Sequence, residues 1–181
     1  VLIGSAIGGF IAQKIEMTQM PQMVAIFNGL GGGASALVAS AEFFSQYNQS
    51  PSPFLLVTII LSVFIGTLTL TGSFVAFGKL QGFISGKPIV FPAQQLFNVV
   101  LFVSIFALGY FILGDSTDLN IFYSILIVAA ILGITLTIPI GGADMPVVIS
   151  LLNSYSGIAA AATGFVLLNN ALAAFYQFLP S

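Results

Sequence analysis

Several residue types on which much protein chemistry depends are missing from this sequence of 181 residues, which contains no cysteine, histidine, arginine or tryptophan. Without cysteine and histidine there can be no disulfide bond, no zinc site of the usual kind, no thiol nucleophile and no catalytic triad built on histidine. Charged residues make up only 4% of the chain, against about 25% in a soluble domain, which excludes an ordinary solvated surface. Three scattered lysines also exclude the basic patch with which proteins bind nucleic acid.

Most of the chain consists of long apolar runs with few charged residues. Hydrophobic residues make up 58% of the chain, and its mean hydropathy is +1.12. Helix-length apolar runs cover residues 1–13, 20–44, 54–77, 96–113, 119–138, 145–168 and 171–179. An apolar helix of about 20 residues crosses the roughly 30 Å hydrocarbon layer of a membrane. Strands of a membrane barrel would alternate apolar and polar residues, and these runs do not.

The runs therefore predict an all-α membrane protein, a polytopic bundle of about six transmembrane helices plus a truncated last one. We expect residues 1–181 to form a single transmembrane domain whose first partner is the lipid bilayer. The first run looks cut short, and neither a methionine nor a basic segment precedes it. We therefore expect the numbering to begin inside a longer polypeptide.

The three lysines predict the orientation of the bundle. Lys14 follows the first run, and Lys79 and Lys87 lie between the third and the fourth. Connections after odd-numbered spans share one side of a membrane, so all three lysines fall on that side. Lysine-rich loops face the cytoplasm, or the matrix in a mitochondrion.

Polar side chains inside the apolar runs recur on one helix face, often at seven-residue spacing. The candidates are Asn28, Ser35 and Glu42 in the second run, Ser62, Thr69 and Ser73 in the third, and Asn153 and Ser156 in the sixth. Polar groups inside a membrane are costly and mark candidate functional sites. Serine and threonine also let helices pack closely and hydrogen-bond to one another, which is the interpretation we favour for them. For the two asparagines, an interhelical clamp and an aqueous path stay equally open.

Three further features have a plain structural interpretation. Glu42 lies near the outer end of its run, which favours a solvated helix terminus over a buried proton carrier. Residues 29–34 fit the nucleotide-binding pattern G-x-G-x-x-A, but no strand precedes them, as that pattern requires; we predict a helix-packing surface instead. Asp144 precedes the sixth run, with Pro146 just inside it, which predicts an N-cap.

Three longer blocks, residues 16–25, 71–80 and 141–157, resemble the membrane domain of the β subunit of proton-translocating NAD(P) transhydrogenase. The resemblance implies an enzyme complex that couples proton passage to hydride transfer from NADH to NADP+. It implies that NAD(H) and NADP(H) bind in soluble domains of the complex, and that this fragment holds no cofactor, metal or catalytic residue and transfers no hydride alone. The implied partners are transmembrane helices of the α subunit, the NADP(H)-binding domain and a second copy in a homodimeric complex. The implied location is the bacterial cytoplasmic membrane, with the mitochondrial inner membrane second.

The resemblance also assigns roles to residues. Asn28 matches a position at which many members carry a histidine central to proton transfer, and the lack of histidine here implies that a partner subunit supplies the ionisable group. Asn153 matches an asparagine facing the same path, and Asp144 matches an acidic residue where the NADP(H)-binding domain docks. The predicted proton path comprises Asn28, Asn153, Ser35, Thr69, Ser73 and Glu42.

Two other functions agree with the residues taken alone. One is an ion channel or secondary transporter unrelated to redox chemistry. The other is a scaffold bundle whose polar residues only join helices. A transporter would more typically show two repeats with broken helices around a central site, and the sequence shows no such pairing.

Overall fold

The computed structural model describes residues 2–46, 49, 51–115 and 118–177, and within these ranges it contains helices and connections but no strand. The helices are α1 (Leu2–Lys14), α2 (Met20–Ser45), α3 (Pro53–Leu80), α4 (Gln94–Asp115), α5 (Leu119–Thr137) and α6 (Met145–Gln177). Short 3-10 turns, Met17–Gln19 and Gly142–Asp144, lead into α2 and α6. The all-α prediction is confirmed.

The number of spans differs from the prediction. Within the described residues, the helices α2 to α6 are long and apolar enough to cross a membrane. The 13 residues of α1 reach only about 20 Å at 1.5 Å per residue. The separate last span predicted from residue 171 is wrong as far as Gln177, because α6 runs unbroken from Met145 to Gln177; no glycine or proline interrupts it near residue 170. The rest of that predicted span, residues 178–179, lies outside the described residues.

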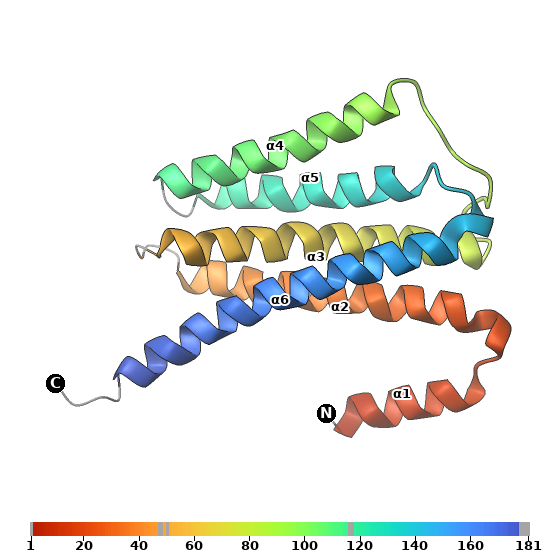
Figure 1. Cartoon of the computed structure of the whole chain (residues 1–181), viewed down its shortest axis with the longest axis horizontal. Helices are drawn as coiled ribbons and strands as arrows, with labels where there is room; N and C mark the ends of the chain where they lie inside the picture. Colours follow the sequence, from red (N-terminus) through yellow and green to blue (C-terminus); the bar gives the residue numbers. More distant parts are fainter. Residues whose placement is uncertain (1, 47–48, 50, 116–117, 178–181) are drawn as a thin grey trace.

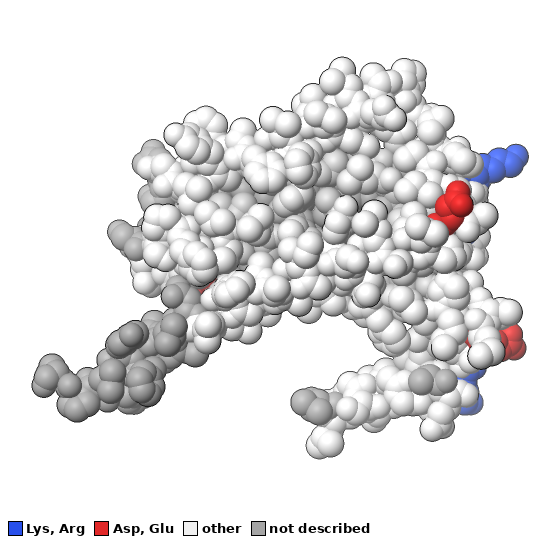
Figure 2. All heavy atoms as spheres, viewed as in Figure 1, with Lys and Arg blue, Asp and Glu red and all other residues white. Residues whose placement is uncertain are grey.

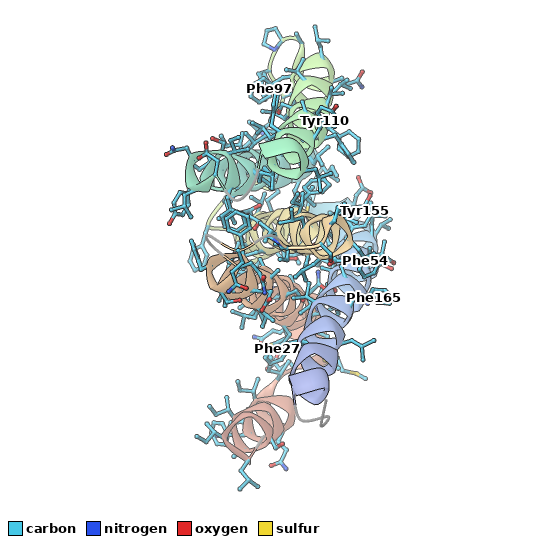
Figure 3. All side chains as sticks on the ribbon, turned by 90° about the vertical axis from the view of Figure 1, so that its left-hand side faces the viewer. Phe27, Phe54, Phe97, Tyr110, Tyr155 and Phe165 are labelled. Atoms are coloured by element: carbon cyan, nitrogen blue, oxygen red, sulfur yellow. The ribbon has the colours of Figure 1, made fainter. Side chains whose placement is uncertain are left out.

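The helix α3 forms the centre of the bundle. It packs against α2 and α6 on one side and against α5 and, over a shorter stretch, α4 on the other, an arrangement that Figure 3 shows along the helices. Ser52 caps its start by accepting a hydrogen bond from the Leu55 amide at 3.3 Å, and Pro53 occupies its first turn. By contrast, α1 lies apart from the other helices (Figure 1), and large side chains such as Leu2 and Phe10 are exposed on it.

Glycines let α2 and α3 approach closely. A Cβ atom added to Gly32 would lie 2.9 Å from the carbonyl oxygen of Gly66 and 2.9 Å from the Cβ atom of Thr69. A Cβ atom on Gly29 would lie 3.0 Å from that of Ser73. The glycine-rich segment is therefore a helix-packing surface, as predicted.

Charge is confined to the ends of the bundle. In the face shown in Figure 2, blue and red atoms gather near helix ends, and the broad surface between them carries neither colour. Both α1 and α3 end on the right-hand side of Figure 1, where the connection between α3 and α4 also lies. All three lysines belong to these elements. We call this side the lysine end, and the other the opposite end.

Candidate functional site

Buried polar groups, together with the half-buried Ser156, lie on the faces along which α2, α3 and α6 pack. Seven residues are 20° short of two helical turns, so side chains at this spacing stay on one face. The groups are Asn28, Ser35 and Glu42 of α2, Ser62, Thr69 and Ser73 of α3, and Ser156 and Thr163 of α6. We call this set the polar ladder.

The layer nearest the lysine end joins all three helices. Asn28 is 7% exposed, and its Nδ2 donates a hydrogen bond to Ser73 Oγ at 3.0 Å. Ser156 Oγ lies 2.7 Å from Asn28 Oδ1 and 2.8 Å from the carbonyl oxygen of Asn153. Because a hydroxyl has one hydrogen to donate, Ser156 can donate it to either acceptor. The layer is thus a hydrogen-bonded cluster with a choice of arrangement.

A second layer lies further along the helices. Ser62 Oγ and Thr163 Oγ1 are hydrogen-bonded to each other, and both lie within reach of the Ser35 carbonyl oxygen, at 3.3 and 3.5 Å. Both hydroxyls also reach the carbonyl oxygen of Ala159, at 3.4 and 2.9 Å. Two hydroxyls therefore share two carbonyl acceptors in the interior of the bundle.

Thr69 lies between these two layers. Its side chain is 0% exposed, and its Oγ1 has no hydrogen-bond partner among the described residues. Its Cβ and Cγ2 atoms pack against Gly32, where an added Cβ atom would lie only 2.9 and 3.0 Å from them. A buried hydroxyl without a protein partner is costly and is usually satisfied by an ordered water molecule. Thr69 Oγ1 is therefore the ladder atom between the layers that still needs a hydrogen-bond partner.

Glu42 lies at the opposite end of the ladder, and the expectation that it is a solvated helix terminus is wrong. Its side chain is only 8% exposed, and Gln46 Nε2 donates a hydrogen bond to its Oε1 at 2.7 Å. The physical reason is that Gln46 lies four residues, about one helical turn, after Glu42, so that its side chain reaches back to the carboxylate.

Asn153 does not join the ladder through its side chain. It is exposed and lines a groove of about 390 Å³ between the first turns of α2 and α6, where Pro21 and Pro146 also lie. Only its backbone carbonyl approaches the ladder, through Ser156. The structure thus brings Asn28 and Ser73 together, aligns Ser35, Thr69 and Glu42 behind them, and leaves the Asn153 amide facing outward.

The predicted N-cap at Asp144 is wrong. Asp144 belongs to the turn Gly142–Asp144, which runs directly into α6, whereas an N-cap residue has non-helical backbone angles. Gly141, with φ −67° and ψ 151°, is the N-cap of this 3-10 turn. Asp144 is exposed in the first turn, where a negative charge interacts favourably with the helix dipole.

Sequence reasoning named Ser62 and Ser156 only as packing residues and missed Thr163. The signal was present, since Thr163 follows Ser156 by seven residues, the spacing that identified Asn28, Ser35 and Glu42. Within the described residues, no three Asp, Glu, His or Cys side chains lie close enough together to hold a metal ion. The site therefore offers amides, hydroxyls, carbonyls and one carboxylate.

Comparison with known proteins identifies relatives over nearly the whole chain. A family model described as "NAD(P) transhydrogenase beta subunit" matches residues 1–176. Two sequences named "NAD(P) transhydrogenase subunit beta" from Rhodospirillum rubrum, one of them from a named strain, are 44% identical to the chain over 175 residues. Each alignment covers 93% of this chain but 38% of the relative, so the chain spans less than half the length of these relatives.

Proposed function

Because the chain belongs to the NAD(P) transhydrogenase beta subunit family, we propose that it is the part of that subunit that carries protons across the membrane. The chain is a multi-pass membrane segment of a subunit of an enzyme complex. In our proposal, proton passage is coupled to hydride transfer from NADH to NADP+, which takes place in soluble domains that bind NAD(H) and NADP(H). We place the complex in the bacterial cytoplasmic membrane.

The polar ladder is the observation that carries this proposal. In an apolar bundle each polar group costs free energy, and a chain of them through the interior between three helices is more than packing requires. Hydroxyls and amides can donate and accept, so they can hold water molecules that relay a proton. Neutral Asn28 cannot store the proton itself, whereas the Glu42 carboxylate can accept one near the opposite end.

The exposed side of α6 supports a role for partner helices. The Asn153 amide faces outward beside the groove between α2 and α6, and a polar group facing lipid is costly. We propose that a transmembrane helix of the α subunit covers it and supplies an ionisable histidine, a residue type that this chain lacks. We further propose that the complex is a homodimer and that the NADP(H)-binding domain docks near Asp144.

The test uses the intact complex in sealed vesicles and compares proton pumping with hydride transfer. In Asn28→Leu, which removes both hydrogen bonds of the amide, we expect pumping to fall about tenfold, the effect of losing about 1.4 kcal/mol, while hydride exchange between bound nucleotides persists. The control is Thr58→Val, because the Thr58 hydroxyl is bonded within its own helix, to the Leu55 carbonyl at 2.8 Å. Normal pumping in assembled Asn28→Leu would show that Asn28 only clamps helices.

A further inference from the structure

Lys79 is a buried cation outside the polar ladder. It lies in the last turn of α3, and its side chain is 4% exposed. Its Nζ donates hydrogen bonds to the carbonyl oxygens of Lys87 at 3.1 Å, Ile138 at 2.6 Å and Ile140 at 2.8 Å. A lysine ammonium has three hydrogens, so each can be donated to one of these carbonyls.

The three carbonyls come from two separate connections at the lysine end (Figure 1). Lys87 lies in the connection between α3 and α4, and Ile138 and Ile140 lie in the turn between α5 and α6. Two backbone hydrogen bonds join the same connections, from the Gly142 amide to the Gly86 carbonyl at 2.8 Å and from the Ile89 amide to the Ile138 carbonyl at 3.3 Å. We call residues 81–93 and 138–144, joined in this way, the collar.

Lysine is suited to this position by donor count and by charge. Hydrogen bonds from an ionised donor are about twice as strong as neutral ones, and a cation in the last turn of a helix interacts favourably with its dipole. Among the described residues, backbone carbonyls and no carboxylate bind the ammonium. A shorter or neutral side chain would leave the Lys87 and Ile140 carbonyls without this donor, and residues 138–144 would lose their hydrogen bonds to the end of α3.

The collar leads directly into the elements that form the ladder. Its second connection includes the turn with Asp144 and continues into α6, on which Ser156 lies about 17 Å further along. On α3, Ser73 lies six residues before Lys79, a distance of about 9 Å along the helix. A shift of the collar relative to α3 would therefore move Ser156 relative to Asn28 and Ser73.

We propose that Lys79 is a positioning residue for coupling. By attaching the collar to α3, it fixes Asp144 and the start of α6 and so holds Ser156 in hydrogen-bonding position with Asn28. This inference rests on the proposed function, because it assumes that the NADP(H)-binding domain docks at the collar and that movement of the collar changes the hydrogen bonds of the proton path.

The test measures two quantities separately in the intact complex, the hydrogen exchange of collar amides and the rate of proton-coupled hydride transfer. In Lys79→Met we expect hydrogen exchange at the Ile89 and Gly142 amides to accelerate about tenfold. We expect proton-coupled hydride transfer to fall about tenfold, while hydride exchange between bound nucleotides persists. Each tenfold change corresponds to about 1.4 kcal/mol. Lys87→Met is the matched control, since only the backbone carbonyl of Lys87 contacts Nζ.

Chemical rescue distinguishes the ammonium group from general packing. In a background without other reactive cysteines, Lys79→Cys should behave like Lys79→Met, and aminoethylation of that cysteine, which restores an ammonium at nearly the same distance, should recover slow exchange and coupling together. If Lys79→Met does not assemble, Lys79→Gln replaces it, because its amide can bond to only two of the three carbonyls and should give intermediate exchange.

Two results would overturn the proposal. Exchange at the two amides that stays at the parent rate in the Lys79 variants would show that Lys79 does not hold the collar. Accelerated exchange with unchanged coupling would show that the collar has no part in coupling. Failure of the proposed proton path would appear differently, as normal pumping in Asn28→Leu, and would leave the exchange result unaffected.

Discussion

At the scale of single residues, Thr69 is the position at which a packing role and a water-binding role of a ladder hydroxyl can be distinguished most clearly. A hydroxyl that only fills space between α2 and α3 contributes nothing that a methyl group could not. A hydroxyl that binds water between the Asn28 layer and the Ser62 layer links the two layers. The absence of a partner for Thr69 Oγ1 among the described residues makes the two roles testable by one substitution.

Thr69→Val removes the hydroxyl and keeps the shape of the side chain. We expect the thermal stability of the complex to stay the same or rise, because loss of a buried polar group without a protein partner is neutral or favourable. We expect proton pumping to fall about fivefold, the effect of losing about 1 kcal/mol. The control is Thr71→Val, since Thr71 is bonded to the Thr67 carbonyl of its own helix at 3.1 Å. Parent-like pumping in Thr69→Val would exclude a relay through this hydroxyl.

At the scale of helices, apolar length and seven-residue spacing predicted most of what the structure contains. The positions of α2 to α5 and the faces bearing Asn28 and Ser62 follow from local sequence, because helix geometry is the same everywhere. The pair Asn169–Asn170 separates the two apolar runs in the sequence but does not end α6, because asparagine only weakly disfavours a helix. The N-cap predicted at Asp144 did not allow for the 3-10 turn Gly142–Asp144, which places Asp144 inside a turn whose own N-cap is Gly141.

The close approach of α2 and α3 can be tested by adding one methyl group. In Gly32→Ala the new Cβ atom would lie 2.9 Å from the Gly66 carbonyl oxygen, and overpacking of this kind costs about 1–3 kcal/mol. The thermal unfolding temperature of the complex should fall accordingly. Gly31→Ala is the matched control, because nothing lies within 4 Å of its added Cβ atom and alanine favours a helix. Equal unfolding temperatures for both variants would contradict the packing described here.

At the scale of the whole molecule, the ladder extends from near the lysine end to near the opposite end. Asn28 and Glu42 are 14 residues apart on α2, about 21 Å along the helix axis, which is most of the hydrocarbon thickness. Sequence alone could not show that Asn153 turns outward while Ser156 and Thr163 turn inward, because that depends on how α6 is rotated against α2 and α3. It likewise could not show that the Lys79 ammonium lies among three carbonyls contributed by distant residues.

The central claim is that protons pass the position of Asn28, and the most direct measurement is the pH dependence of coupled activity in Asn28→His. An imidazole there adds a titratable group with an ordinary pKa near 6.5. We predict that the pH profile of proton-coupled hydride transfer shifts, while that of hydride exchange between bound nucleotides does not. Phe27→His serves as control, because Phe27 is 49% exposed on the outer face of α2. A coupled profile for Asn28→His that superimposes on that of the parent complex would contradict the account.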